Sequence, residues 1–447
     1  MKPELRFNAF TMNCIGHQSP GLWTHPRCRS TQFNTLAYWT DLARILERGL
    51  FEGVFLADVL GVYDVFGGSA DAALRAATQV PAGDPMLVIP AMAMVTSELG
   101  FGVTSSLSYE PVFPFARRMS TLDHLTGGRI GWNIVTSYLD SAARAAGQQR
   151  QRAHDDRYDV AEDYMQAILA LWERSWEDRA VLRDTARGIY ADPARVHRIR
   201  HDGPHVQLDA IHLQEPSPQR TPVLYQAGSS PRGREFAARY AECVFVSGPT
   251  AAIVGARADA IRALARAAGR DAAAIRCFSL ATVIVAETDR QAQDLQQEYR
   301  AHVSHEGALA LMSGWTGIDL SRLPLDQAIR HVENDAGRSA LDNITRADPD
   351  RRWTVRDVAE HVGIGGIGPV FVGSAASVAD QVEGWAAESG IEGFNLCQVV
   401  AHETFEAVGR WLVPELQRRG RFKRSYRPGT LREKLGGAGP GRRRVEN

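Results

Sequence analysis

The sequence of 447 residues has no excess of either charge, few cysteines and no long apolar run. Its 51 basic and 52 acidic residues give a formal net charge of −1. Proteins that bind nucleic acids along the phosphate backbone usually carry a concentrated basic surface. The charge balance therefore argues against nucleic acid as a partner.

Cysteine usage and hydropathy argue against a disulfide-stabilised protein and against a membrane protein. The five cysteines are Cys14, Cys28, Cys243, Cys277 and Cys397. They are odd in number and form no Cys-x-x-Cys pair, which is typical of reduced, intracellular chains rather than of disulfide scaffolds. The longest apolar stretch, residues 86–95, is half a membrane span, and the first residues lack a run of signal-peptide length. We therefore expect a soluble, cytoplasmic protein with no membrane partner.

The sequence does contain a repeated order of short apolar strand, polar turn and amphipathic helix. Eight strands are predicted at residues 5–10, 53–58, 99–107, 129–136, 223–228, 243–248, 277–286 and 393–400. This order predicts an α/β fold, a (β/α)₈ TIM barrel, over residues 1–425.

Three segments depart from the repeated order. Residues from about 177 to 220 are expected to be an insertion with a short hairpin, and those from about 300 to 368 an insertion with several helical pieces. The second insertion could act as a lid or an oligomer contact. The glycine- and arginine-rich C-terminal tail, 426–447, is expected to be mobile or to wrap around a neighbouring chain.

Polar residues stand where several predicted strands end, notably Asp58, Thr104, Asn133 and Ser229. The carboxyl ends of all barrel strands lie on one face, where enzymes of this fold place their chemistry. Asp58 follows an otherwise apolar strand, and an unpaired carboxylate there would be costly. A ligand contact and a structural salt bridge are both open for it.

Two local motifs could hold a ligand. In 228–233 (GSSPRG), Ser229 and Ser230 offer hydroxyl and N–H groups at a helix N-terminus, which favours phosphate, although a serine-capped turn is an equal alternative. His154 and Tyr158 lie four residues apart on one helix face and could contact a ligand or steady a reactive intermediate. A solvated first turn is the competing interpretation.

Two other patterns are interpreted as having no cofactor role. The sequence GIGGIG (363–368) matches G-x-G-x-x-G, but an apparent strand follows it, whereas a dinucleotide motif follows a strand and opens a helix. It is therefore expected to be a flexible turn. The histidine pairs His201/His205 and His302/His305 lack the context of a zinc site, so no metal is expected.

Several longer segments together resemble the bacterial luciferase-like flavin monooxygenases, in the subgroup of nitrilotriacetate monooxygenase, dibenzothiophene-sulfone monooxygenase and pristinamycin synthase. They are LERGLFEGVFLAD, TLDHLTGGRIGWNIVTS, HDDRYDVAEDYM, PSPQRTPVLYQAGSSPRGREFAARYAE and VPELQRRG. The resemblance runs over nearly the whole chain.

The resemblance implies FMN, bound as FMNH₂, with O₂ as cosubstrate. It implies flavin contacts at Asp58, Thr104, His154, Tyr158, Ser229 and Ser230. The two serines would hold the phosphate, with Asp58 and Thr104 nearer the ring and ribityl chain. His154 and Tyr158 are also the implied catalytic residues. A separate NAD(P)H:flavin reductase and a homodimer or homotetramer are the implied partners.

The implied activity is that of a two-component monooxygenase. It would insert one oxygen atom from O₂ into a small organic substrate, with an organosulfur compound such as a dialkyl sulfide favoured. An aminopolycarboxylate, a sulfone or another xenobiotic, or a deazaflavin-dependent oxidoreductase of the same fold, are the alternatives. Position alone suggests pocket roles for Met12, Cys14, Trp23, His25, Trp132 and Tyr138, with core packing as the competing interpretation.

Overall fold

Eight parallel strands close into a barrel, as the sequence predicts. The computed structural model describes residues 3–228, 230–328 and 352–441. The barrel strands are β1 (Arg6–Met12), β2 (Gly53–Ala57), β3 (Gly100–Ser106), β4 (Ile130–Val135), β9 (Val223–Gln226), β10 (Cys243–Val246), β11 (Arg276–Ala286) and β13 (Gly393–Cys397). They pair in this order, and β13 pairs with β1 to close the ring. The carboxyl ends of all eight strands therefore meet on one face.

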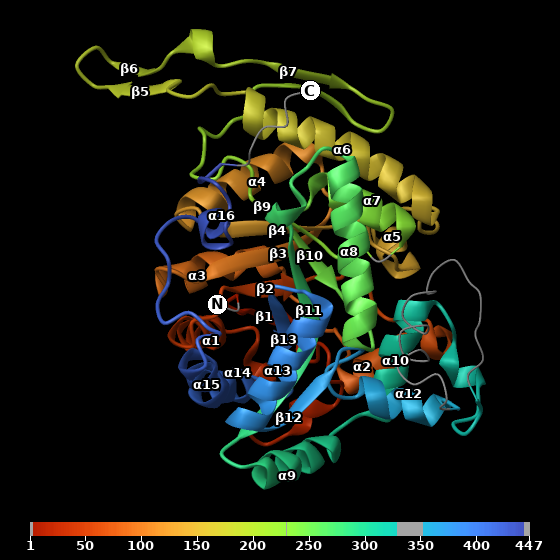
Figure 1. Ribbon diagram of the computed structural model, residues 1–447. Helices are drawn as coiled ribbons and strands as arrows, with labels where there is room; N and C mark the ends of the chain where they lie inside the picture. The colour runs from red at the N-terminus through yellow and green to blue at the C-terminus, as the bar shows by residue number, and fades with distance from the viewer. Residues whose placement is uncertain (1–2, 229, 329–351, 442–447) are drawn as a thin grey trace.

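Helices surround the barrel (Figure 1). They include α1 (Leu36–Arg48), α3 (Ile89–Met94), α4 (Val112–Leu125), α6 (His154–Arg174), α7 (Pro231–Tyr240), α8 (Ala251–Ala267) and α13 (Ala375–Ser389). The last outer helix runs through α14 (Glu403–Ala407), a π-helical segment (Val408–Leu412) and α15 (Val413–Arg418). Each has the amphipathic pattern expected of a helix that covers a sheet. In α1, for example, Thr35 caps the N-terminus by accepting from the Tyr38 N–H, and Leu42 and Leu46 are fully buried.

The first insertion forms two β-hairpins rather than the single one expected. They are β5 (Val181–Asp184) with β6 (Ile189–Ala191), and β7 (Ile199–Asp202) with β8 (Gln207–Ala210). Figure 1 shows them as an arm that extends beyond the helices. Further helices are α2 (Asp71–Ala76), α5 (Asp140–Ala145), α9 (Asp289–Arg300) and, in the second insertion, α10 (His305–Thr316) and α12 (Val355–Val362). Among the described residues, no helix combines the length and apolar character needed to cross a bilayer.

The GIGGIG segment is a turn between helix and strand, as predicted. It follows α12 and leads to β12 (Val370–Ser374), which pairs with β11 outside the ring. Gly365 and Gly366 have φ values of 76° and 69°, in the left-handed region that favours glycine. The side chains of Thr282 and Gln18 lie where Cβ atoms on these two glycines would be. The glycines therefore allow a tight turn against the barrel.

Part of the C-terminal tail fills the amino end of the barrel. Leu431 and Leu435, on and just after α16 (Leu431–Lys434), pack with Phe55, Tyr225 and Phe278 of the barrel interior. Arg432 is 4% exposed and donates to the Glu242 carboxylate at 2.6 Å. The expectation of a mobile tail is therefore wrong for residues 431–435, because apolar and ionic contacts within the chain hold them against the barrel.

Candidate active site

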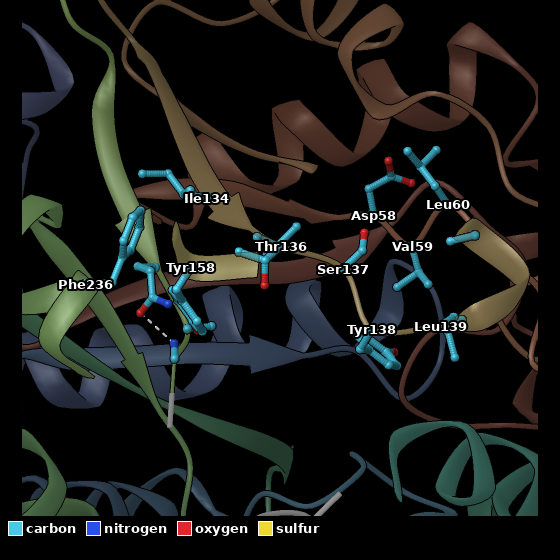
Figure 2. Close-up of a pocket in the computed structure, with 15 residues that line it drawn as sticks. Asp58, Val59, Leu60, Ile134, Thr136, Ser137, Tyr138, Leu139, Tyr158 and Phe236 are labelled. Carbon is cyan, nitrogen blue, oxygen red and sulfur yellow. Dashed lines mark hydrogen bonds between the residues drawn. The ribbon is translucent and has the colours of Figure 1, made fainter. Parts of the chain in front are cut away.

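Two adjoining cavities open at the carboxyl ends of the strands. The first cavity extends from Asp58 along 134–139 to Tyr158 and the 226–228 turn, and the second extends from Asp58 to Gln79, Met86, Thr104 and Glu110. Both are lined by Asp58, Val59 and Leu60. Figure 2 shows the first cavity, with Tyr158 and Phe236 at one end and Asp58 and Leu60 at the other. Together the cavities form one elongated site.

A tight turn before α7 forms one end of the first cavity. The Gly228 N–H donates to Gln226 Oε1 at 2.6 Å, the dashed line in Figure 2. A Cβ atom on Gly228 would lie 2.8 Å from the Gly233 Cα, so a larger residue does not fit. Ser230 Oγ accepts from the Gly233 N–H at 3.0 Å and caps the helix. The positive end of the α7 dipole thus faces the turn, an arrangement that suits an anion. Ser229 lies outside the described residues.

Tyr158 connects α6 to this turn. Its side chain lines the first cavity and is 6% exposed, and its hydroxyl lies 2.7 Å from where a Cβ atom on Gly233 would be. Burial raises the pKa of the Tyr158 phenol, which therefore stays protonated at neutral pH. A neutral phenol can donate one hydrogen bond to a ligand at this end.

His154 lies behind Tyr158 and lines neither cavity. It is the first residue of α6, as predicted, and its ring centroid is 5.3 Å from that of Tyr158. Its Nδ1 lies 2.7 Å from the Asp155 carboxylate, and its side chain is 34% exposed. The sequence placed both residues on one helix face, but only Tyr158 reaches a cavity wall in this structure.

Asp58 lies where the two cavities meet. Its burial raises its pKa to about 7, and the nearby carboxylates of Asp84 and Glu110 act in the same direction. The Val59 N–H partly offsets this effect. No basic partner of Asp58 occurs among the salt bridges of the described residues, so the salt-bridge alternative finds no support here.

Thr104 lines the second cavity and is bonded to Asn133 on the next strand. Asn133 Nδ2 donates to Thr104 Oγ1 at 3.0 Å, and both residues are at least 95% buried. Asn133 Oδ1 is buried and has no hydrogen-bond partner among the described residues. Asn133 lines neither cavity, but because a buried acceptor without a donor is costly, this oxygen behind Thr104 is a candidate contact for a ligand N–H or O–H group.

The cavity walls also contain residues that the sequence did not single out. Gln226 and Phe236 line the first cavity, and Gln79 lines the second. Gln226 could have been found, because it is a polar residue at the end of an apolar strand. Of the six aromatic, cysteine and methionine residues suggested by position, only Tyr138 lines either cavity. Trp132 is instead fully buried against Phe115.

The fold and the site define a barrel enzyme with an elongated pocket at the carboxyl ends of its strands and a helix N-terminus at one end of that pocket. Residues 7–393 match the model of the luciferase-like monooxygenases. The chain belongs to this family and is a monooxygenase, as the resemblance implied.

Two curated relatives align over almost the whole chain. Dimethyl-sulfide monooxygenase of Hyphomicrobium sulfonivorans is 48% identical over 99% of this chain and 92% of its own length. Long-chain alkane monooxygenase of Geobacillus thermodenitrificans is 44% identical over 98% of this chain and 96% of its own.

Solved structures agree with the fold. The crystal structure of DmoA from Hyphomicrobium sulfonivorans has a TM-score of 0.92 and 47% identity, covering 98% of this chain and 93% of that one. Riboflavin lyase, solved with modified FMN and riboflavin, has a TM-score of 0.89 and 37% identity, covering 98% of this chain and 97% of that one.

Proposed function

We propose that this monooxygenase uses reduced FMN, supplied by a separate NAD(P)H:flavin reductase, to transfer one atom of O₂ to a small organosulfur compound such as a dialkyl sulfide. The observation that carries the proposal is the elongated site, with the N-terminus of α7 at one end and Asp58 at its centre. The similarity to dimethyl-sulfide monooxygenase supports the substrate class. The relative solved with modified FMN supports the cofactor.

The turn before α7 fits the FMN phosphate. Ser230 uses an oxygen lone pair to cap α7, and its hydroxyl, which also bonds with the Tyr158 phenol, can turn to donate to a phosphate oxygen. The adjacent backbone N–H groups, Ser229 and the Tyr158 phenol complete the proposed phosphate contacts. Ser229 has this role from the resemblance and from its place in the turn.

The middle of the site fits the polar edge and ribityl chain of the flavin. The partnerless Asn133 Oδ1 suits a donor, and the flavin ring and ribityl hydroxyls both carry donors. Thr104 holds the Asn133 amide in place through its hydroxyl. Asp58, with a pKa near neutral pH, can either donate or accept a hydrogen bond there.

Bound reduced flavin would supply the electrons that activate O₂. The role of the chain is to position the reactants and exclude water, and Val59, Leu139 and Phe236 give the first cavity an apolar wall. For dimethyl sulfide, the balanced reaction consumes O₂ and FMNH₂. It yields methanethiol, formaldehyde, water and FMN, because oxygenation at carbon gives a product that splits into thiol and aldehyde. His154 and Tyr158 are the proposed catalytic residues, with Tyr158 in contact with the ligand and His154 behind it.

The test is a reconstituted assay. Purified protein, FMN, NADH and an unrelated flavin reductase are incubated under air with dimethyl sulfide, a sulfone or an aminopolycarboxylate. Thiol and aldehyde formed only with the sulfide are the expected result. Hydrogen peroxide without any product, or tighter binding of a deazaflavin than of FMN, would refute the proposal. Light scattering of the purified protein tests the proposed homodimer or homotetramer.

A further inference from the structure

The second cavity offers space that the proposed flavin contacts do not fill. It shares Asp58, Val59 and Leu60 with the first cavity and continues away from the phosphate turn, past Val80 and Met86. If the phosphate lies at the Gly228 end, a flavin extends toward Asp58, and the space beyond Asp58 stays open. This space is where a second reactant could approach the flavin.

All the charged side chains that line the second cavity are carboxylates: Asp58, Asp84 and Glu110. Among the described residues, neither lysine, arginine nor histidine lines either cavity. Arg118 donates to Glu110 at 2.9 Å, which neutralises one of the carboxylates. Arg144, on the helix that contributes Ser141 and Ala145 to the wall, is held by Asp64. An anion in this cavity would therefore meet the carboxylate of Asp84, and that of Asp58 where it is ionised, with no cation on the cavity wall to bind it.

Three hydroxyl donors at or near this cavity are also committed within the protein: Ser141, whose hydroxyl donates to the Val62 carbonyl at 2.7 Å, and the phenols of Tyr63 and Tyr138. Tyr63 donates to Gln79 Oε1 at 3.0 Å, while the Gln79 amide nitrogen donates to the His17 carbonyl at 3.1 Å. Because the single proton of Tyr63 points to Gln79, the 2.6 Å contact between the two phenols requires Tyr138 to donate to Tyr63. Neither phenol has a proton left for a substrate. A carboxylate there would lose its hydration without gaining a hydrogen bond from either phenol.

We infer that the second cavity receives the organic substrate and selects uncharged molecules over anions. The inference rests on the proposed function and narrows it. Neutral sulfides and similar apolar compounds fit the apolar wall of Val59, Val80 and Met86, whereas aminopolycarboxylates and other acids do not.

The test compares two nearly isosteric ligands, (methylthio)acetamide and (methylthio)acetate. Their affinities for the protein loaded with oxidised FMN are measured by calorimetry, and each is also tested as an inhibitor of dimethyl sulfide turnover. We expect the amide to bind at least about tenfold more tightly than the carboxylate, as for a charge buried without a partner. Equal binding, or tighter binding of the carboxylate, overturns the inference.

Substitutions of single carboxylates test whether they cause the preference for the uncharged ligand. Glu110→Gln and Asp84→Asn should each narrow the ratio of the two affinities, and asparagine keeps the capping acceptor that Asp84 offers to the Met86 N–H. Asp178→Asn, which removes an exposed carboxylate beside Arg220 outside both cavities, is the matched control and should leave the ratio unchanged. A ratio equally insensitive to all three changes overturns the assignment to this cavity.

An FMN titration of the same preparation separates the two proposals. If FMN binds normally but the amide and the carboxylate bind equally well, only the present inference is refuted. Absence of FMN binding removes the proposed function and the inference together.

Discussion

Replacing Asp58 by asparagine should change how the stability of the ligand-free protein depends on pH. Burial raises the pKa of this carboxyl from 3.8 to about 7. In the unfolded chain the group regains its usual pKa, so between these two values the folded protein binds a proton that the unfolded chain has released. The stability contributed by the neutral carboxyl is complete below the unfolded pKa and is lost as pH rises through the folded pKa. Asparagine has the same shape and loses no proton.

The size of the effect follows from the pKa shift. Each pH unit within the window is worth about 1.4 kcal/mol, so the full window amounts to about 4 kcal/mol as an upper bound. Between about pH 5 and pH 7 the gain in stability of Asp58→Asn over the wild type should grow by about 2–3 kcal/mol. Above about pH 7 it should level off.

The assay is urea denaturation of both proteins across this pH range. Every other titrating group is common to the two chains, so the difference between their unfolding free energies isolates Asp58. Loss of the Val59 N–H contact would add an offset that is independent of pH. A difference that stays constant from pH 5 to pH 8, or that shrinks as pH rises, would show that Asp58 is an ordinary ionised carboxylate and refute the reasoning.

Three further changes have defined outcomes. Ser229→Ala should weaken FMN binding by about 1–2 kcal/mol in a fluorescence titration, and unchanged affinity would count against the phosphate assignment. His154→Ala should raise the hydrogen peroxide formed per NADH consumed without altering the circular dichroism spectrum, and a normal product yield would remove its catalytic role. Arg432→Ala should destabilise the protein by about 3–5 kcal/mol in denaturant unfolding, because its guanidinium bonds to Glu242 and to barrel carbonyls while almost fully buried. A loss below about 1 kcal/mol would contradict that structural role.

The barrel could be predicted from local pattern, but strand ends could not. Residues 393–400 were expected to form one strand, yet β13 ends at Cys397. The N–H groups of Val399 and Val400 donate instead to Thr404 Oγ1, at the start of the next helix. Similarly, β9 ends at Gln226 because the Gly228 N–H turns back to the Gln226 side chain. Side-chain hydrogen bonds at strand ends compete with the backbone hydrogen bonds of the sheet. Sequence periodicity does not reveal which of the two forms.

Only part of the candidate site could be predicted from local sequence pattern. Asp58, Thr104 and Tyr158 line the two cavities: Asp58 directly follows β2, Thr104 lies near the end of β3, and Tyr158 lies near the start of α6. Tyr63 and Gln79 gave no such signal, since both lie in irregular segments. Their importance depends on the contact of Tyr63 with Tyr138, which joins segments 75 residues apart.

The amino-acid sequence by itself determined the alternation of strand and helix, and therefore the barrel and the face on which its polar residues gather. Hydrophobic periodicity and turn chemistry act over a few neighbouring residues, so they can be read along the chain. Only the tertiary structure decided that α16 of the C-terminal tail would fill the amino end of the barrel and that three carboxylates would line one cavity. Those outcomes depend on burial and charge shared between distant segments, which no local pattern encodes.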